Sequence, residues 1–112
     1  CVSTYPLHPK NANILKLKEL NKLFKWVGYS DHMQGVESAK VALEFGIHAI
    51  EKHFTVDNEL PGRDNKFAIL PKQLNDLSKY LKLRNDMMID NGLDYQDFEL
   101  DSRLNYTGRF DG

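Results

Sequence analysis

Two histidines, His32 and His53, are the residues of this chain best suited to bind a metal ion. Each closes a short β-prone segment, so each is expected at the end of a strand. Imidazoles at neighbouring strand ends can hold a divalent ion whose other positions are filled by water and substrate oxygen. A closed structural zinc site needs four protein ligands, and the chain has one cysteine and four histidines. The pattern favours a Mn²⁺ or Mg²⁺ site, with histidines that only form hydrogen bonds as the alternative.

Polar residues near these histidines recur at every second position, the spacing that places side chains on one face of a strand. The three sets are Cys1, Ser3 and Tyr5; Gly28, Ser30 and His32; and Ala49, Glu51 and His53. The polar members lie at the C-terminal end of each set, where parallel sheets and barrels build their active sites. Three such strand ends in phase predict one shared pocket.

Charged residues beside the histidines have simpler interpretations. Asp31 is expected to cap the following helix or to orient an imidazole. Lys52 has the opposite parity to Glu51 and His53, which favours an ion pair on the outer surface. The loop from Asp57 to Lys66 follows the third predicted strand and is expected over the mouth of the pocket, with an ordinary turn as the alternative.

The elements that must position these residues alternate between strand and helix, at roughly thirty residues per unit. Strands are expected over Cys1 to Tyr5, Lys25 to Tyr29 and Ile47 to Phe54. Helices are expected over Asn11 to Phe24, from Gln34 to Phe45 before a stop at Gly46, and from Pro71 to before Gly92. This order is typical of right-handed βαβ units around a parallel sheet. It predicts an α/β fold of three consecutive βα units with parallel strands.

The spacing of apolar residues predicts which face of the last helix is buried. Leu74, Leu77, Leu81 and Met88 follow helical periodicity and are expected to form a buried stripe. After this helix, residues 92–112 are rich in acidic side chains and are interpreted as a linker or arm. Its expected aromatic contact points are Tyr95, Phe98, Tyr106 and Phe110.

Length and composition limit the classes of protein. A complete eight-fold β/α barrel needs roughly 250 residues, so 112 residues can supply only a part of one. Fifteen basic against sixteen acidic residues give a net charge of −1, which argues against nucleic-acid or anionic-membrane partners. The single cysteine cannot form an intrachain disulfide, and the chain contains no long apolar segment. A cytoplasmic location is therefore predicted.

Three segments, taken together, resemble one enzyme family. They are Cys1-Val2-Ser3-Thr4-Tyr5-Pro6, Val27-Gly28-Tyr29-Ser30-Asp31-His32, and Ile50-Glu51-Lys52-His53-Phe54-Thr55 with the later Leu60-Pro61-Gly62-Arg63-Asp64. In this order and spacing the set resembles the sialic acid synthase family, which condenses phosphoenolpyruvate with N-acylated mannosamine-type sugars. The resemblance implies that residues 1–91 are the C-terminal part of a (β/α)8 TIM barrel, corresponding to its sixth to eighth strands and helices.

The resemblance also implies roles for individual residues. His32 and His53 would hold the divalent ion, which acts as a Lewis acid on the sugar aldehyde. Ser3, Tyr5 and Ser30 would bind phosphoenolpyruvate, and Glu51 would act in catalysis by orienting water or the developing hydroxyl. Asp64 would bind sugar hydroxyls. Arg63 replaces an uncharged residue of many family members, which makes it the expected determinant of sugar choice.

Two other classes of function remain open from the sequence. One is another phosphoenolpyruvate-dependent sugar-acid synthase, such as a deoxy-octulosonate synthase. The second is a non-catalytic metal-binding module that self-associates through exposed sheet edges. In the enzyme interpretation the parent protein is an expected homo-oligomer, and the 112 residues alone are expected to be inactive because most of the pocket wall would be missing.

Overall fold

The computed structural model describes residues 1–106 and 108, so the contact predicted for Phe110 lies outside the described residues. The chain divides into two compact units, residues 1–82 and 83–112. The first unit contains the sheet and the predicted site, and the second begins within the last turns of the long helix α3 (Pro71–Met87). In the described part of the chain no helix is long and apolar enough to cross a membrane.

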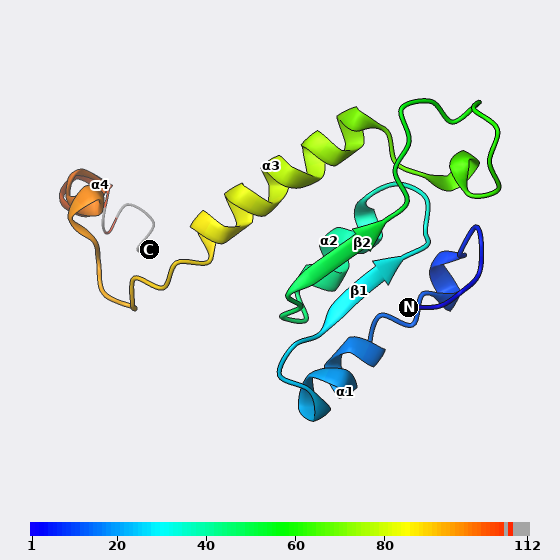
Figure 1. The fold of residues 1–112 in the computed structure, drawn as a ribbon. Coiled ribbons are helices and arrows are strands. Elements are labelled where there is room, and N and C mark those ends of the chain that lie inside the picture. The colour runs from blue at the N-terminus through cyan, green and yellow to red at the C-terminus, as the bar shows by residue number, and fades with distance from the viewer. Residues whose placement is uncertain (107, 109–112) are drawn as a thin grey trace. The chain divides into compact units, whose positions relative to one another are not determined.

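A parallel two-stranded sheet forms the centre of the first unit (Figure 1). Its strands are β1 (Gly28–Asp31) and β2 (Ala49–Lys52), joined through helix α2 (Glu37–Leu43). The register pairs Ser30 with Glu51 and Asp31 with Lys52. Because side chains alternate across a strand, these two neighbouring pairs lie on opposite faces of the sheet. The α/β class and the parallel strand order predicted from the sequence are confirmed.

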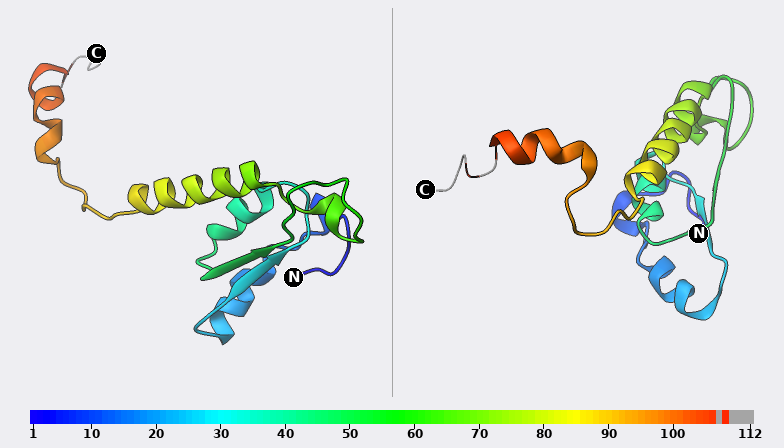
Figure 2. Two further views of the ribbon diagram at one scale, coloured as in Figure 1. Left: turned by 45° about the horizontal axis from the view of Figure 1, so that its top comes forward. Right: turned by 90° about the vertical axis from the view of Figure 1, so that its left-hand side faces the viewer.

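Two clusters of apolar side chains fix the helices against this sheet. Helix α1 (Lys16–Leu23) contributes Leu17, which packs with Val27, Tyr29 and Ala42. Ala39 of α2, Val36 at the N-cap of α2 and Leu77 of α3 pack with Ile69. Figure 2 shows α2 lying along the sheet. The sheet is thus held from its helix-facing side, and the carboxyl ends of both strands are left to build a site.

The strand predicted for Cys1 to Tyr5 is wrong. This segment has no regular secondary structure, and four of its five residues are exposed. A strand needs a partner for its backbone groups and a face to bury. This segment and the adjoining Leu7 instead hydrogen bond to His32, just after β1: the Leu7 amide donates to the His32 carbonyl at 3.3 Å, and the His32 ring bonds to the Val2 carbonyl and the Tyr5 hydroxyl. The described fold therefore contains two consecutive strands of the predicted three.

The other elements are shorter than their predicted ranges. The first predicted helix begins only at Lys16, because Asn13 adopts a left-handed conformation with φ of 49° that interrupts the helix. The strand predicted to end at Tyr29 instead runs to Asp31. Gly46, with φ of 69°, follows the end of α2 as predicted. Asp31 caps no helix, since Val36 occupies the N-cap of α2.

The buried stripe predicted for α3 is mostly wrong. Of its four residues only Leu77 is buried, while Leu74 and Met88 are exposed at 46% and 62%. Leu77 lies opposite Val36 and Ile69, whereas the other positions meet few apolar partners within the described chain. Helical spacing shows which apolar residues share a face, but burial depends on what packs against that face.

The second unit contains a short helix in the segment interpreted as a linker or arm. A 3₁₀ turn (Asp97–Glu99) leads into α4 (Leu100–Tyr106). Gln96 and Glu99 form a reciprocal capping box at its start, in which each side chain accepts a bond from the other residue's backbone N–H. This capping pattern is visible in the sequence and could have predicted the start of a helix here.

Candidate active site at the strand ends

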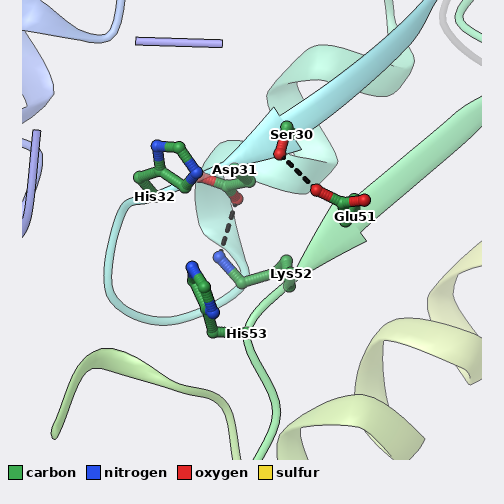
Figure 3. Close-up of a pocket in the computed structure, with 6 residues that line it drawn as sticks. All are labelled: Ser30, Asp31, His32, Glu51, Lys52 and His53. Atoms are coloured by element: carbon green, nitrogen blue, oxygen red, sulfur yellow. Dashed lines mark hydrogen bonds and ion pairs between the residues drawn. The ribbon is translucent and has the colours of Figure 1, made fainter. Parts of the chain in front are cut away.

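The carboxyl ends of β1 and β2 form a small pocket lined by three residues from each strand end (Figure 3). The lining residues are Ser30, Asp31, His32, Glu51, Lys52 and His53. They occupy equivalent positions because the strands are parallel and in register. The structure therefore joins two of the three polar strand ends predicted from the sequence.

The two histidines lie as close together as neighbouring strand ends predict. Their ring centroids are 5.8 Å apart. Both Nε2 atoms face the hydroxyl of Tyr5, which is 2.9 Å from His32 and 3.3 Å from His53. Tyr5 thus reaches the site even though its segment forms no strand.

Hydrogen bonding fixes the tautomer of His32. Its Nδ1 lies 2.8 Å from the carbonyl oxygen of Val2, and a carbonyl can only accept, so Nδ1 carries the proton. Nε2 of neutral His32 is then an acceptor, and the Tyr5 hydroxyl donates to it. The same oxygen accepts from Nε2 of His53. A ring whose Nδ1 donates to a backbone carbonyl is oriented as metal-binding histidines are.

These residues fit a divalent ion held by two nitrogens. The two Nε2 atoms converge beside an open pocket on the point that the Tyr5 hydroxyl occupies. Imidazole suits several divalent ions, and ligation by both nitrogens requires Nε2 of His53 to lose its proton and the hydroxyl to move aside or join the ligands. Within the described residues, no group of three or more His, Cys, Asp or Glu side chains gathers around such a point. Further positions would fall to water, substrate or other parts of the intact protein.

Ser30 and Glu51 form a polar pair on the same face of the sheet. The Ser30 hydroxyl donates to Oε1 of Glu51 at 2.7 Å. Glu51 is exposed and Ser30 is half-buried, so the carboxylate can also accept from a bound molecule in the pocket. The pair places a hydroxyl and a carboxylate beside the two imidazoles.

The remaining predicted site residues lie outside this pocket. Ser3 is exposed and contacts Cys1, with 3.7 Å between Oγ and Sγ. Arg63 and Asp64 belong to the loop after β2 and do not line the pocket. That loop is held by Asn65, whose side chain donates to the carbonyls of Asp57 and Leu60. These hydrogen bonds give the loop a defined backbone conformation, which fixes where Arg63 and Asp64 lie.

One feature that the sequence analysis misjudged is the ion pair between Asp31 and Lys52. Lys52 was expected to pair on the outer surface, but its Nζ lies 2.8 Å from Asp31 Oδ2 in an almost fully buried position. The feature that indicates this ion pair is the strand register, because it aligns Asp31 with Lys52 on the helix-facing side of the sheet.

Tyr29 lies on the same face of β1 as Asp31 and carries a shifted pKa. Burial of its hydroxyl, together with the negative charge of Asp31, raises the pKa of Tyr29 to about 12. Among the described residues this buried hydroxyl has no hydrogen-bond partner. Tyr29 therefore remains neutral beneath the site at physiological pH.

The shift predicts a loss of stability in alkali. Unfolding lets Tyr29 ionise near its ordinary pKa of 10, so this contribution is full below pH 10 and is lost as pH rises towards 12. Between pH 8 and pH 11 it corresponds to about 1 kcal/mol. Urea unfolding of Tyr29→Phe should show a correspondingly smaller alkaline loss than the wild type; equal losses would contradict the prediction.

The fold and site define a parallel α/β protein whose strand ends carry a pair of imidazoles, a carboxylate and a hydroxyl. A sequence model described as the NeuB family matches residues 1–91. The chain belongs to this family of sialic acid and other nonulosonic acid synthases. The family assignment made from the three motifs is confirmed.

Individual relatives agree with this assignment. The chain is 34% identical over 85 residues to N-acetylneuraminate-9-phosphate synthase of Mus musculus, covering 74% of this chain and 24% of the relative. It is 37% identical over 75 residues to N,N'-diacetyllegionaminic acid synthase of Campylobacter jejuni, covering 66% and 22%. The chain thus spans about a quarter of the length of these relatives.

A solved structure has the same arrangement of elements. The N-acetylneuraminic acid synthetase of Leptospira borgpetersenii, crystallised in complex with citrate, superposes with a TM-score of 0.76 at 32% identity. The match covers 95% of this chain and 39% of that chain. The parallel α/β arrangement therefore resembles that of a sialic acid synthase.

Proposed function

We propose that the intact protein condenses phosphoenolpyruvate with an N-acylated amino sugar to form a nonulosonic acid and release phosphate. The observation that carries this proposal is the convergence of both histidine Nε2 atoms at strand ends that also present Ser30 and Glu51. Family membership supplies the reaction class. In this proposal residues 1–91 are the C-terminal part of a TIM barrel, residues 92–112 an acidic linker or arm, and the enzyme a cytoplasmic homo-oligomer.

The proposed reaction has three bond changes. C3 of phosphoenolpyruvate attacks the aldehyde carbon of the open-chain sugar, forming the new carbon–carbon bond. Water adds at C2, and the bond between C2 and the bridging phosphate oxygen breaks. Mn²⁺ or Mg²⁺, when bound by His32 and His53, supplies Lewis acidity at the aldehyde.

The chain's own polar residues have distinct parts in this proposal. The Ser30 hydroxyl, already a donor to Glu51, binds phosphoenolpyruvate, with Ser3 and Tyr5 beside it. Glu51 accepts hydrogen bonds from the water that adds at C2 or from the developing hydroxyl. Asp64, on the loop after β2, accepts hydrogen bonds from sugar hydroxyls.

Phosphate release by the intact protein tests the function. It should require phosphoenolpyruvate, an N-acylated hexosamine and a divalent ion together, and chelation should stop it. In ¹⁸O-labelled water the released phosphate should remain unlabelled, because the C–O bond breaks and the P–O bond does not. Labelled phosphate, or release without sugar, would indicate simple hydrolysis. Condensation with arabinose 5-phosphate but with no N-acylated sugar would favour a deoxy-octulosonate synthase.

Arg63 is expected to set the preference among acceptor sugars. Its exposed guanidinium is a planar donor on the loop after β2 and can recognise an amide carbonyl of the acyl group. Arg63→Met should change the ratio of kcat/KM between competing N-acylated sugars several-fold, equivalent to about 1 kcal/mol. The exposed Lys18 of α1 offers a control, because Lys18→Met removes a cation away from the pocket. A ratio that is unchanged in both variants would remove Arg63 from sugar choice.

A further inference from the structure

We propose that the buried ion pair of Asp31 and Lys52 positions His32 and His53 relative to one another. The two charged residues form the last rung of the sheet, and the two histidines follow them directly. Figure 3 shows the ion pair drawn next to both histidine side chains. The inference rests on the proposed function only where it concerns metal binding; the positioning itself can be tested without a metal.

The pair is almost completely removed from water. The side chains of Lys52 and Asp31 are 5% and 0% exposed, and Nζ lies 2.8 Å from Oδ2. Burying two charges carries a desolvation penalty that their attraction offsets only with good geometry and further hydrogen bonds. Such a pair is a poor source of stability compared with apolar packing, so a positioning role gives it a clearer physical reason.

The additional hydrogen bonds converge on the residue after His32. The amide of Met33 donates to Asp31 Oδ1 at 3.0 Å, and the carbonyl of Met33 accepts from Lys52 Nζ at 2.9 Å. His32 therefore stands between Asp31 and Met33, and both of these backbone neighbours are fastened by the same ion pair. Lys52 in turn precedes His53, so one set of bonds restrains both histidine-bearing segments.

Helix α2 anchors this set of bonds to the core. The Ser38 hydroxyl donates to Asp31 Oδ2 at 2.5 Å, and Ser38 is buried beside Ala39, which belongs to an apolar cluster. The carboxylate thus accepts from a hydroxyl, an ammonium and a backbone amide. Although Lys52 contributes to the pocket lining, its Nζ is already bonded twice and its side chain is only 5% exposed. It therefore acts through the histidines and not by touching substrate.

The test removes both charges at once, so that neither is left buried without a partner. Asp31→Asn with Lys52→Met removes both charges together, because a single substitution would bury an uncompensated charge. The matched control is Glu19→Gln with Lys22→Met, which removes an exposed pair of 3.1 Å on α1. Both double variants should be made in the intact protein and compared with Lys52→Arg, which keeps a cation at the buried position.

Two measurements report on the histidines: the tautomer of the His32 ring and the affinity for Mn²⁺. Imidazole ¹⁵N shifts should show His32 as the Nδ1-protonated tautomer in the wild type, the control and Lys52→Arg, and as a mixture in the neutral double variant. Mn²⁺ affinity, followed by electron paramagnetic resonance, should fall about 10–100-fold in the neutral double variant only.

The outcomes separate this inference from the proposed function. An unchanged tautomer and unchanged Mn²⁺ affinity in a folded neutral variant would overturn the positioning role. A tautomer change in a protein that binds no Mn²⁺ would support the positioning role and refute the metal part of the proposed function. If the neutral variant does not fold, Ser38→Ala removes one donor to Asp31 and no charge, and a single unchanged His32 tautomer there would equally overturn the inference.

Discussion

His32→Ala should reduce sugar-dependent phosphate release by more than about 100-fold, and His53→Ala should do the same. Loss of a residue that merely orients a metal ligand costs 10–100-fold in affinity or activity, so loss of a ligand should cost more. Either substitution leaves one imidazole where two Nε2 atoms now face the same oxygen. The measurement pairs steady-state kinetics with Mn²⁺ titration, and both readouts should fall together.

The other histidines provide controls for this prediction. His48 is exposed, and its ring packs against Trp26 with centroids 4.6 Å apart. His48→Ala should leave Mn²⁺ affinity and phosphate release within about twofold of the wild type, since surface substitutions away from special features have small effects. An equal loss from His48→Ala and His32→Ala would show that the effect is one of general stability. Retained activity in His32→Ala would refute the two-histidine site.

The sequence predicted the class of fold because hydrophobic periodicity is local. Alternating polar and apolar residues fixed β1 and β2 to within three residues, and Gly46 marked the end of α2. What periodicity could not predict is whether a segment finds a partner. Cys1 to Tyr5 has the composition of a strand but forms no pairing with another strand, and Met88, expected on the buried face, is exposed just after α3 ends.

The strand-end residues of the site were predicted from parity, and the misjudged burial of Lys52 has the same origin. Counting by two placed Ser30 and Glu51 together, and they hydrogen bond across the sheet. The same count placed Lys52 on the other face and favoured an ion pair on the outer surface, but parity says nothing about depth. The burial of Lys52 and Asp31 arises because α2 covers that face, which only the tertiary structure reveals.

Glu51→Gln should lower kcat by about 100-fold or more while changing KM for phosphoenolpyruvate little. Glutamine preserves the side-chain length and an oxygen that can accept from Ser30, now bonded to Glu51 at 2.7 Å. It removes the negative charge and the capacity to take up a proton. Positioned acid–base groups contribute roughly 10²- to 10⁴-fold to rate, so the loss should appear in the chemical step.

Ser30→Ala separates binding from catalysis in this pair. It removes the donor to Glu51 and the group proposed to bind phosphoenolpyruvate, so KM for phosphoenolpyruvate should rise several-fold while kcat falls less than in Glu51→Gln. Glu19→Gln on exposed α1 is the matched control for loss of a carboxylate and should change neither constant. If Glu51→Gln retains kcat, then Glu51 serves only to hold Ser30, and the carboxylate that handles the proton must lie elsewhere in the intact protein.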